Sequence, residues 1–205
     1  MDRADLVREL LPLVRDRMVV DAIARVPREV FVPAPLRDVA WENQALPLPE
    51  GQSISQPLVV AEMCEMLELR GRETVLDVGT GSGYHAAVLA RLCERVISIE
   101  CRPSLAEAAR RALRFAGVQN VTVLTGNGTE GLPDEAPFDA INIAAASAED
   151  PGRELLNQLA EGGRLIAPIG GEGEPQHLVL FAKRNGRIER KVDGSVRFVP
   201  LVSDV

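Results

Sequence analysis

The amino-acid sequence predicts an α/β fold: a doubly wound, mostly parallel sheet with helices on both faces and an antiparallel C-terminal hairpin at the sheet edge. Short runs of Val, Ile and Leu alternate with helical segments over residues 57–170, a pattern typical of parallel sheets covered on both faces. A glycine-rich turn follows the first of these runs. The segment "HLVLFAKRNGRIERKV" (177–192) then predicts two strands joined by an Asn-Gly turn, the strongest short signal for a hairpin.

The N-terminal region differs from the alternating part of the chain. Apolar residues between positions 4 and 26 have roughly helical spacing, which Pro12 interrupts. Residues 27–57 are rich in proline, and this favours extended and turn conformations. Residues 57–69 then place apolar side chains on one helical face, with Pro57 at a favourable first position and Gly71 as the expected stop.

Each later element follows from the period of its apolar residues. Runs of β-branched and aliphatic residues predict strands, and the Ala-, Leu- and Arg-rich segments between them predict helices. The strands are expected at 74–78, 95–100, 121–126, 138–145 and 164–170, and the helices at 84–93, 103–117 and 153–163.

Composition and charge exclude several classes of protein. The formal net charge of −7 opposes binding to nucleic acid or to an anionic membrane surface, because both require a basic footprint. No stretch reaches the roughly 18 apolar residues of a membrane span, and the N-terminus lacks a signal-peptide pattern. We therefore expect a cytoplasmic protein and, without a feature that favours assembly, a monomer.

Cysteines and histidines show no metal-ligand spacing. Cys64, Cys93 and Cys101 are odd in number and lie in predicted helices and strands, so we expect reduced, buried thiols. The two histidines, His85 and His177, are far apart in the sequence. We expect no metal site, and for His85 a packed role in an early helical turn rather than a part in chemistry.

The turn "LDVGTGSG" carries the clearest chemical signal. Gly79, Gly81 and Gly83 follow Asp77 with the spacing GxGxG, which is a poor match to the dinucleotide fingerprint GxGxxG and lacks the lysine of a phosphate-binding P-loop. Glu100 ends the next predicted strand, 17 residues after Gly83, where its carboxylate can accept both hydroxyls of a ribose. The two features together predict a nucleoside-type cofactor.

The turn resembles the DxGxGxG loop of class I S-adenosylmethionine-dependent methyltransferases, and other segments narrow the resemblance. The chain is similar to the protein-L-isoaspartate O-methyltransferase family in the order of its motifs, over about residues 5–202. These motifs are "VPREVFVP" (26–33), "LPLPEGQSISQP" (46–57), "GNGTEGLPDEAPFDAINIAAA" (126–146), "GGRLIAPIG" (162–170) and "RFVPLV" (197–202).

The resemblance implies S-adenosylmethionine as cofactor, S-adenosylhomocysteine as its product and no metal. It implies methyl transfer to the α-carboxylate of L-isoaspartyl residues in damaged proteins and peptides, which starts repair through a succinimide. It also implies a single methyltransferase domain over 1–205, made of a helical and proline-rich cap segment (1–56), a cofactor-binding core (57–170), and a hairpin and substrate-covering tail (171–205).

Roles for individual residues also come from the resemblance. Ser55 corresponds to the serine assigned to the active site, and we expect it to bind the substrate carboxylate. The residues expected to bind the cofactor are Ser53, Ile54, Asp77, Gly79, Gly81, Gly83, Glu100, Asn127 and Gly128. The backbone of Val199 and Leu201 is expected to bind the substrate peptide.

Asn127 departs from the family pattern, which usually has aspartate there as the acceptor for the adenine amino group. An asparagine oxygen still accepts, but without the assistance of a charge.

The serines of "GQSISQP" (51–57) admit three interpretations: a helix cap, a nucleophile, or a hydrogen-bond donor to a carboxylate. A carboxylate nucleophile is already ionised at neutral pH and needs no general base, which suits a chain without a His–Asp or Cys–His pattern. We therefore expect Ser55 to orient the substrate, and Ser53 to cap a helix or to contact the cofactor.

Two other functions remain open at this point. One is a carboxylate O-methyltransferase of the same family that acts on a different peptide. The other is a non-catalytic binding module that retains the fold, although the intact glycine loop and Glu100 argue against it.

Overall fold

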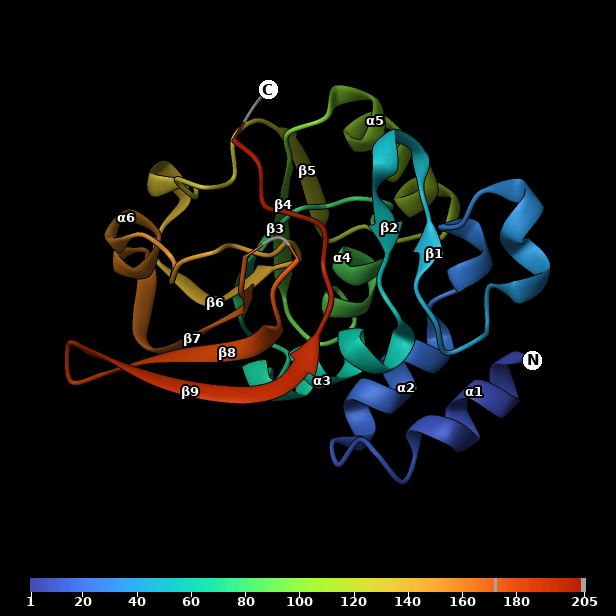
Figure 1. Ribbon diagram of the computed structural model, residues 1–205, viewed down its shortest axis with the longest axis horizontal. Coiled ribbons are helices and arrows are strands. Elements are labelled where there is room, and N and C mark those ends of the chain that lie inside the picture. The colour runs from blue at the N-terminus through green and yellow to red at the C-terminus, as the bar shows by residue number, and fades with distance from the viewer. Residues whose placement is uncertain (172, 204–205) are drawn as a thin grey trace.

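The computed structural model describes residues 1–171 and 173–203 as a seven-stranded sheet flanked by helices (Figure 1). The strand order is β5-β4-β3-β6-β7-β8-β9, parallel from β5 to β7 and antiparallel from β7 to β9. The strands are β3 (Thr74–Val78), β4 (Arg95–Glu100), β5 (Val121–Thr125), β6 (Phe138–Ile143), β7 (Leu159–Ile169), β8 (Gln176–Arg184) and β9 (Arg187–Val196). The predicted doubly wound α/β fold with a C-terminal hairpin is confirmed.

Alternate side chains of the central strands pack into two separate hydrophobic cores, one on each face of the sheet. Val75 packs against the helical face and Leu76 packs against the opposite face, as the two-residue period of a strand requires. The helical face carries α1 (Arg3–Leu10), α2 (Arg17–Arg25), α3 (Pro57–Leu67), α4 (Tyr84–Leu89) and α5 (Pro103–Phe115), whereas the opposite face carries α6 (Arg153–Asn157).

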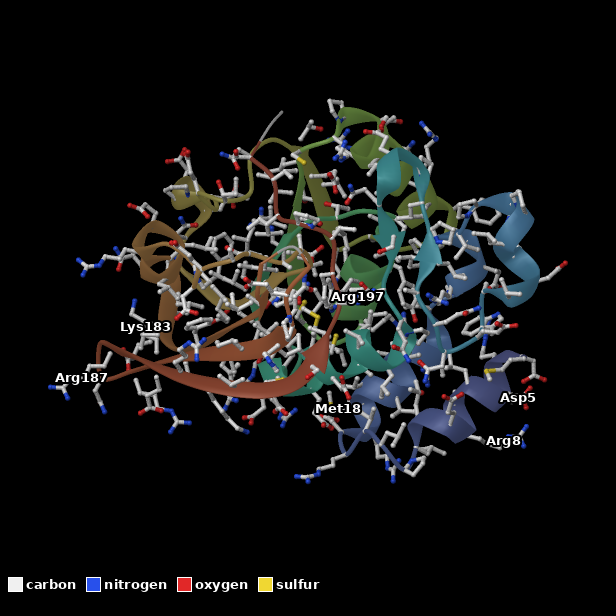
Figure 2. The ribbon with its side chains drawn as sticks, in the orientation of Figure 1. Asp5, Arg8, Met18, Lys183, Arg187 and Arg197 are labelled. Carbon is white, nitrogen blue, oxygen red and sulfur yellow. The ribbon has the colours of Figure 1, made fainter. Side chains whose placement is uncertain are left out.

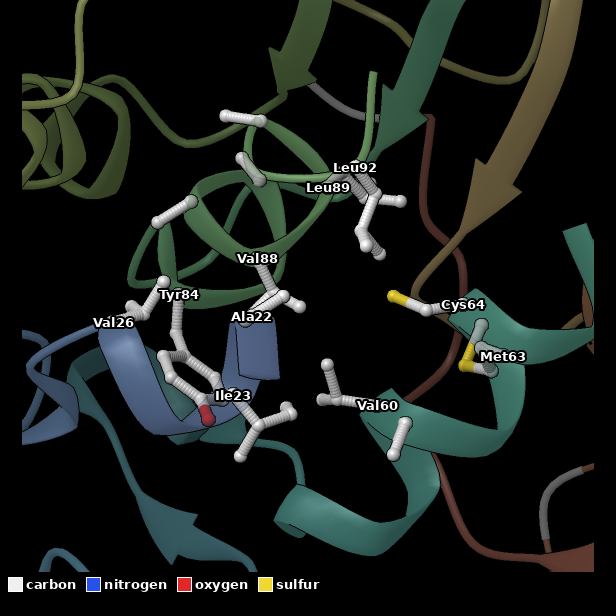
Figure 3. Close-up of a cluster of buried hydrophobic side chains, with 14 of the residues drawn as sticks. Ala22, Ile23, Val26, Val60, Met63, Cys64, Tyr84, Val88, Leu89 and Leu92 are labelled. Carbon is white, nitrogen blue, oxygen red and sulfur yellow. The ribbon is translucent and has the colours of Figure 1, made fainter. Parts of the chain in front are cut away.

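Side chains from α2, α3 and α4 meet in the centre of the larger core (Figure 3). Ile23, Val60 and Val88 are fully buried there, and burying a side chain of this size stabilises the fold by about 1.5–3 kcal/mol. The predicted apolar face of residues 57–69 is confirmed, because Val60, Met63, Cys64 and Leu67 are all buried. This contact fixes the N-terminal segment against the core and so fixes the start of α3.

Four helices end earlier than the sequence predicts. The helix expected at 103–117 ends at Phe115. The helix expected at 57–69 ends at Leu67, because Glu68 adopts a left-handed conformation with φ of 52°. The helix expected at 84–93 ends at Leu89, and the Asn120 side chain donates hydrogen bonds to backbone carbonyls of the turn that follows. The prediction of a helix over 153–163 is wrong: α6 stops at Asn157, and Leu159 pairs with Phe138 as the start of β7.

The proline-rich segment folds into three short 3-10 turns and a small hairpin. The turns are η1 (Arg28–Val30), η2 (Ala34–Val39) and η3 (Pro49–Gly51), and the hairpin pairs β1 (Leu46–Pro47) with β2 (Ser53–Ile54). Figure 1 shows this hairpin beside α4, and Ser53 and Ser55 line the same clefts as Gly79 and Ala146, which follow β3 and β6. The segment therefore brings Ser53 and Ser55 to the carboxyl edge of the sheet.

The β8–β9 hairpin extends away from the body of the protein, with its Asn185-Gly186 turn as predicted (Figures 1 and 2). Edge strand β9 is exposed along residues 187–195 and carries alternating charged side chains, which oppose edge-to-edge pairing between molecules. Within the described ranges, no helix is long and apolar enough to cross a membrane.

Candidate active site

Two adjoining clefts open at the carboxyl ends of the parallel strands, where α/β sheets bind their ligands. We call the first the cofactor cleft; its lining includes Gly79, Gly81, Glu100, Gly128 and Ala144. We call the second the substrate cleft; its lining includes Ser55, Gln56, Ser147, Gln176 and Phe198. Ser53, Val199, Pro200 and Leu201 line both. The substrate cleft has a cavity volume of about 1320 Å³ and the cofactor cleft about 50 Å³, so the tail closely covers the cofactor cleft.

The glycine-rich loop turns from β3 into α4 beneath the cofactor cleft. Gly79, Gly81 and Gly83 have φ values of 91°, 53° and 87°, which side chains with a Cβ rarely adopt. The first two line the cleft, whereas Gly83 precedes α4 and faces Ala109 of α5, where an added Cβ would lie 3.3 Å from the alanine methyl. Gly83 thus supports the packing of two helices and does not reach the cleft.

Glu100 at the end of β4 presents its carboxylate to the cofactor cleft. Oε2 accepts from the Gly81 N–H at 2.8 Å, and Oε1 accepts from the Arg102 N–H at 3.1 Å. Oε1 also accepts a weak hydrogen bond from the Cys101 thiol at 3.6 Å. The carboxylate keeps acceptor capacity for further neutral donors. The structure therefore brings this carboxylate and the glycine loop into one cleft, the pair of features from which the sequence predicted a nucleoside-type cofactor.

Asp77 lies below the loop and lines neither cleft. It is fully buried, and it accepts from Ser98 Oγ and Asn142 Nδ2, both at 2.7 Å. Burial raises the pKa of Asp77 from 3.8 to about 6, although both hydrogen bonds lower it. Asp77 is therefore placed to support the loop from beneath.

His85 lies beside this buried group. Its Nδ1 is 3.3 Å from Asn142 Nδ2 and its Nε2 is 3.5 Å from Cys64 Sγ. Burial lowers the pKa of His85 to about 3, so the ring stays neutral over the physiological range. It does not line either cleft, which supports the packed role expected for it.

Of three other residues predicted to bind the cofactor, one lines the cofactor cleft and two do not. Gly128 lines the cofactor cleft, and an added Cβ there would come within 2.6 Å of Val78 Cγ1. Ile54 is buried in the larger core and lines neither cleft. Asn127 also lies outside both linings, and its Oδ1 accepts from the backbone and the hydroxyl of Thr129, at 2.9 Å and 2.7 Å. The oxygen expected to meet an adenine amino group is thus engaged within its own turn.

The serines of residues 51–57 do not cap α3. The residue that precedes the helix is Gln56, which makes no side-chain cap, while Pro57 occupies the first turn as predicted. Ser53 lines both clefts and Ser55 lines the substrate cleft. Within the described residues the Ser55 hydroxyl makes no hydrogen bond, so it is available to a ligand.

The C-terminal tail lines both clefts and forms an isolated parallel β-bridge between Pro200 and Ala146. The Ala146 N–H donates to Val199 O at 2.8 Å, and the Leu201 N–H donates to Ala146 O at 2.7 Å. The backbone groups of Val199 and Leu201 that were expected to meet a peptide are therefore in part already paired with Ala146, in the segment that follows β6. Gln176 holds the tail from the other side, because its side chain pairs with both the N–H and the C=O of Phe198.

The thiols follow the sequence prediction only in part. Cys64 and Cys93 are buried, and burial raises the pKa of each, that of Cys93 to about 12. Cys101 is only half-buried and lines the cofactor cleft beside Glu100, so the expectation of burial is wrong there. No group of three metal-ligating side chains occurs in the part of the chain that the structure describes.

Sequence reasoning missed Arg28, Asn142 and Gln176. Each is buried and forms hydrogen bonds with groups of the site or the loop beneath it. Only Asn142 had a signal in the sequence, as a polar residue between two isoleucines in "INI".

Comparisons with known proteins agree with one another. The profile of the protein-L-isoaspartate(D-aspartate) O-methyltransferase family matches residues 3–205. Protein-L-isoaspartate O-methyltransferase of Methanoculleus marisnigri is 50% identical over 187 residues, which is 91% of this chain and 84% of that protein. The Roseiflexus castenholzii protein of the same name is 51% identical over 192 residues, covering 92% and 86% of the two chains.

Solved structures extend the comparison to the fold. A protein-L-isoaspartate O-methyltransferase aligns with a TM-score of 0.87 and 30% identity, covering 97% of this chain and 65% of the other. A Plasmodium falciparum structure of the same kind, in complex with S-adenosyl-L-homocysteine, aligns with a TM-score of 0.85 and 23% identity over all of both chains. The second likeness shows the shared fold.

Proposed function

The chain belongs to the protein-L-isoaspartate(D-aspartate) O-methyltransferase family, and from that premise we propose how its own residues methylate isoaspartyl groups. It is an S-adenosylmethionine-dependent enzyme that transfers a methyl group to isoaspartyl residues of proteins and peptides. One observation supports the roles proposed for the individual residues: the Ser55 hydroxyl, which has no hydrogen-bond partner among the residues that the structure describes, lines the substrate cleft beside the cofactor cleft.

The cofactor is held by residues at the carboxyl ends of β3 and β4. The glycine loop would carry its methionine part, and Glu100 would accept from its ribose hydroxyls. When bound, S-adenosylmethionine supplies a methyl group on a positively charged sulfur, which an attacking oxygen can displace. The role of the protein is to align that oxygen with the methyl carbon and to exclude water.

The α-carboxylate of an isoaspartyl residue has a pKa near 4 and is ionised at neutral pH. It therefore needs no general base, and none is offered by His85, whose pKa burial lowers to about 3. One carboxylate oxygen forms the new bond to the methyl carbon as the carbon–sulfur bond breaks. The products are a methyl ester and S-adenosylhomocysteine, and no proton is transferred.

A neutral hydroxyl suits this task better than a cation. An arginine or lysine paired with the carboxylate would stabilise the ground state more than the transition state, in which the negative charge is being lost. The Ser55 hydroxyl donates one hydrogen bond and orients the nucleophile with less of that penalty. Val199 and Leu201, which line both clefts, would hold the peptide on either side of the carboxylate.

Methyl transfer to an isoaspartyl peptide, measured against its normal aspartyl twin, tests this function. We expect methylation of the isoaspartyl peptide with the aspartyl twin close to background. Equal rates for the two peptides would support a different carboxylate substrate. Binding of S-adenosylmethionine without turnover on either peptide would support a non-catalytic module.

Replacing Ser55 with alanine is expected to lower kcat/KM for the isoaspartyl peptide by about 10- to 100-fold. A hydrogen bond to a charged group contributes about 1.5–3 kcal/mol, which corresponds to that range. The dissociation constant of S-adenosylmethionine, measured by calorimetry, should stay within about twofold of the wild-type value, because Ser55 does not line the cofactor cleft. Unchanged turnover by Ser55→Ala would rule out the orienting role.

We also propose that residues 1–205 act as one domain, as a monomer in the cytoplasm. The three free cysteines suit a reducing compartment, and α2, α3 and α4 share one core across the boundary at residue 56. Light scattering coupled to size exclusion should give the mass of one chain; a mass of two chains would contradict the monomer.

A further inference from the structure

Arg28 in η1 is a fully buried arginine that binds only backbone carbonyls and an aromatic ring. Its exposed fraction is 0%. Nη1 donates to the carbonyls of Ala40, at 2.5 Å, and Glu42, at 3.4 Å. Nη2 donates to the carbonyls of Gln44, at 3.1 Å, and Ser55, at 2.9 Å. One guanidinium thus joins the loop around residues 40–44 to the backbone of the proposed active-site serine.

No carboxylate of the described residues forms an ion pair with this charge. Across the described residues the ion pairs do not include Arg28, and its nearest other partner is the ring of Tyr84, 5.3 Å from the guanidinium carbon. Burying a cation without a counter-ion is costly, and a well-packed apolar residue is often the more stable choice at such a position. Stability of the fold therefore does not by itself explain an arginine at position 28. The hydrogen bonds that Arg28 makes explain it better.

Those contacts converge on the start of α3. The Asn43 carbonyl accepts from Gln56 Nε2 at 2.9 Å, and Asn43 Oδ1 accepts from the Leu58 N–H at 3.0 Å. Arg28 and Asn43 together thus bind Ser55, Gln56 and Leu58, at the turn into the helix. The Ser55 backbone is fixed from behind while its hydroxyl faces the substrate cleft.

We propose that Arg28 is a positioning residue for Ser55: its guanidinium fixes the Ser55 carbonyl and so directs the hydroxyl at the substrate carboxylate. This inference rests on the proposed role of Ser55. Arg28 touches neither cleft, so it acts only through the serine. Lysine cannot replace it, because one ammonium cannot span four carbonyls arranged around a planar fork.

Replacing Arg28 with lysine is expected to lower kcat/KM for the isoaspartyl peptide by about 10- to 100-fold, since displacements near 1 Å at a reacting group have effects of this size. The dissociation constant of S-adenosylmethionine should stay within about twofold of wild type. In a Ser55→Ala background the same substitution should cost less than about twofold, because the hydroxyl it directs is already gone.

Asn120→Ala is the matched control, because the Asn120 side chain also donates hydrogen bonds to backbone carbonyls, those of Ala90, Cys93 and Glu94. Asn120 lines neither cleft. It should lower the melting temperature and leave kcat/KM unchanged. All assays are run at least 15 °C below the melting temperature of each variant, a margin of about four to seven times the shift that 1 kcal/mol produces in a chain of this size.

Three results would overturn the proposal: wild-type kcat/KM in Arg28→Lys, losses that multiply in Arg28→Lys/Ser55→Ala, or an Arg28→Lys chain without a cooperative unfolding transition. The last would make Arg28 a residue of the fold. Failure of the proposed function is a separate outcome, recognised when the wild type does not prefer the isoaspartyl peptide or when Ser55→Ala retains full activity.

Discussion

Replacing Glu100 with alanine is expected to weaken the binding of S-adenosylmethionine by at least about 100-fold. The carboxylate faces the cofactor cleft and has acceptor capacity left after its bonds to the N–H groups of Gly81 and Arg102. Two ribose hydroxyls that donate to a charged acceptor contribute about 1.5–3 kcal/mol each, and about 3 kcal/mol corresponds to 100-fold in a dissociation constant. The substitution also removes the bond that holds the Gly81 N–H, so the loop loses support before any ligand binds.

Isothermal titration calorimetry with S-adenosylmethionine measures this effect directly. Glu100→Gln is the informative second variant: its amide must point an NH₂ group at the N–H of Gly81 or of Arg102, so it should bind nearly as poorly as the alanine variant. Glu107→Gln is the control, because it makes the same charge change on an exposed part of α5. A dissociation constant within about threefold of wild type in Glu100→Ala would contradict the ribose assignment.

The sequence predicted this carboxylate because its signal is local. A strand of β-branched residues that ends in an acid, one helix after a glycine loop, can be recognised from spacing alone. The same holds for the fold, since the periods of two and about 3.6 residues separate strands from helices along most of the chain. The failure at 153–163 has a tertiary cause: "LLNQLAE" has helical spacing, but pairing of Leu159 with Phe138 extends β7 instead.

The residues that the sequence could not identify act through distant neighbours. Arg28 is one of 21 arginines in the sequence, and only the folded chain shows that it alone meets the carbonyls of Ala40, Gln44 and Ser55. Asp77 illustrates the opposite case. Its place in the DxGxGxG pattern predicted a cofactor contact, whereas the structure places it beneath the loop, where it binds Ser98 and Asn142.

The Asp77 side chain leads to a second large expected effect, on the pH dependence of stability. Its pKa is raised from 3.8 to about 6, chiefly by burial, so the folded state binds a proton more tightly than the unfolded state does. The contribution of Asp77 to the free energy of unfolding is therefore most favourable below about pH 4 and is lost as the pH rises through 6. The total loss is about 3 kcal/mol, of which roughly half should occur between pH 5 and pH 7.5.

Asp77→Asn removes that titration without removing the hydrogen bonds. In the wild type Ser98 Oγ donates to Asp77, so Thr80 Oγ1, 2.6 Å from Ser98 Oγ, donates to Ser98. With asparagine at position 77 the side-chain oxygen can accept from Asn142, while the NH₂ group donates to Ser98 and the Ser98–Thr80 bond reverses. The neutral variant can satisfy each partner, and it avoids burying a charge.

Urea unfolding of wild type and Asp77→Asn at pH 5 and at pH 7.5 gives the difference in free energy of unfolding at each pH. Between pH 5 and pH 7.5 the variant should gain roughly 1–2 kcal/mol in free energy of unfolding relative to the wild type. The reason is that only the wild type loses stability through Asp77 over this range. Other carboxylates titrate in both proteins and cancel. A difference that does not change with pH would show that Asp77 ionises normally, and a shift toward the wild type would show that its charge stabilises the loop. Either result would mean that Asp77 supports the loop as a carboxylate, held by Ser98 and Asn142, and not as a protonated acid.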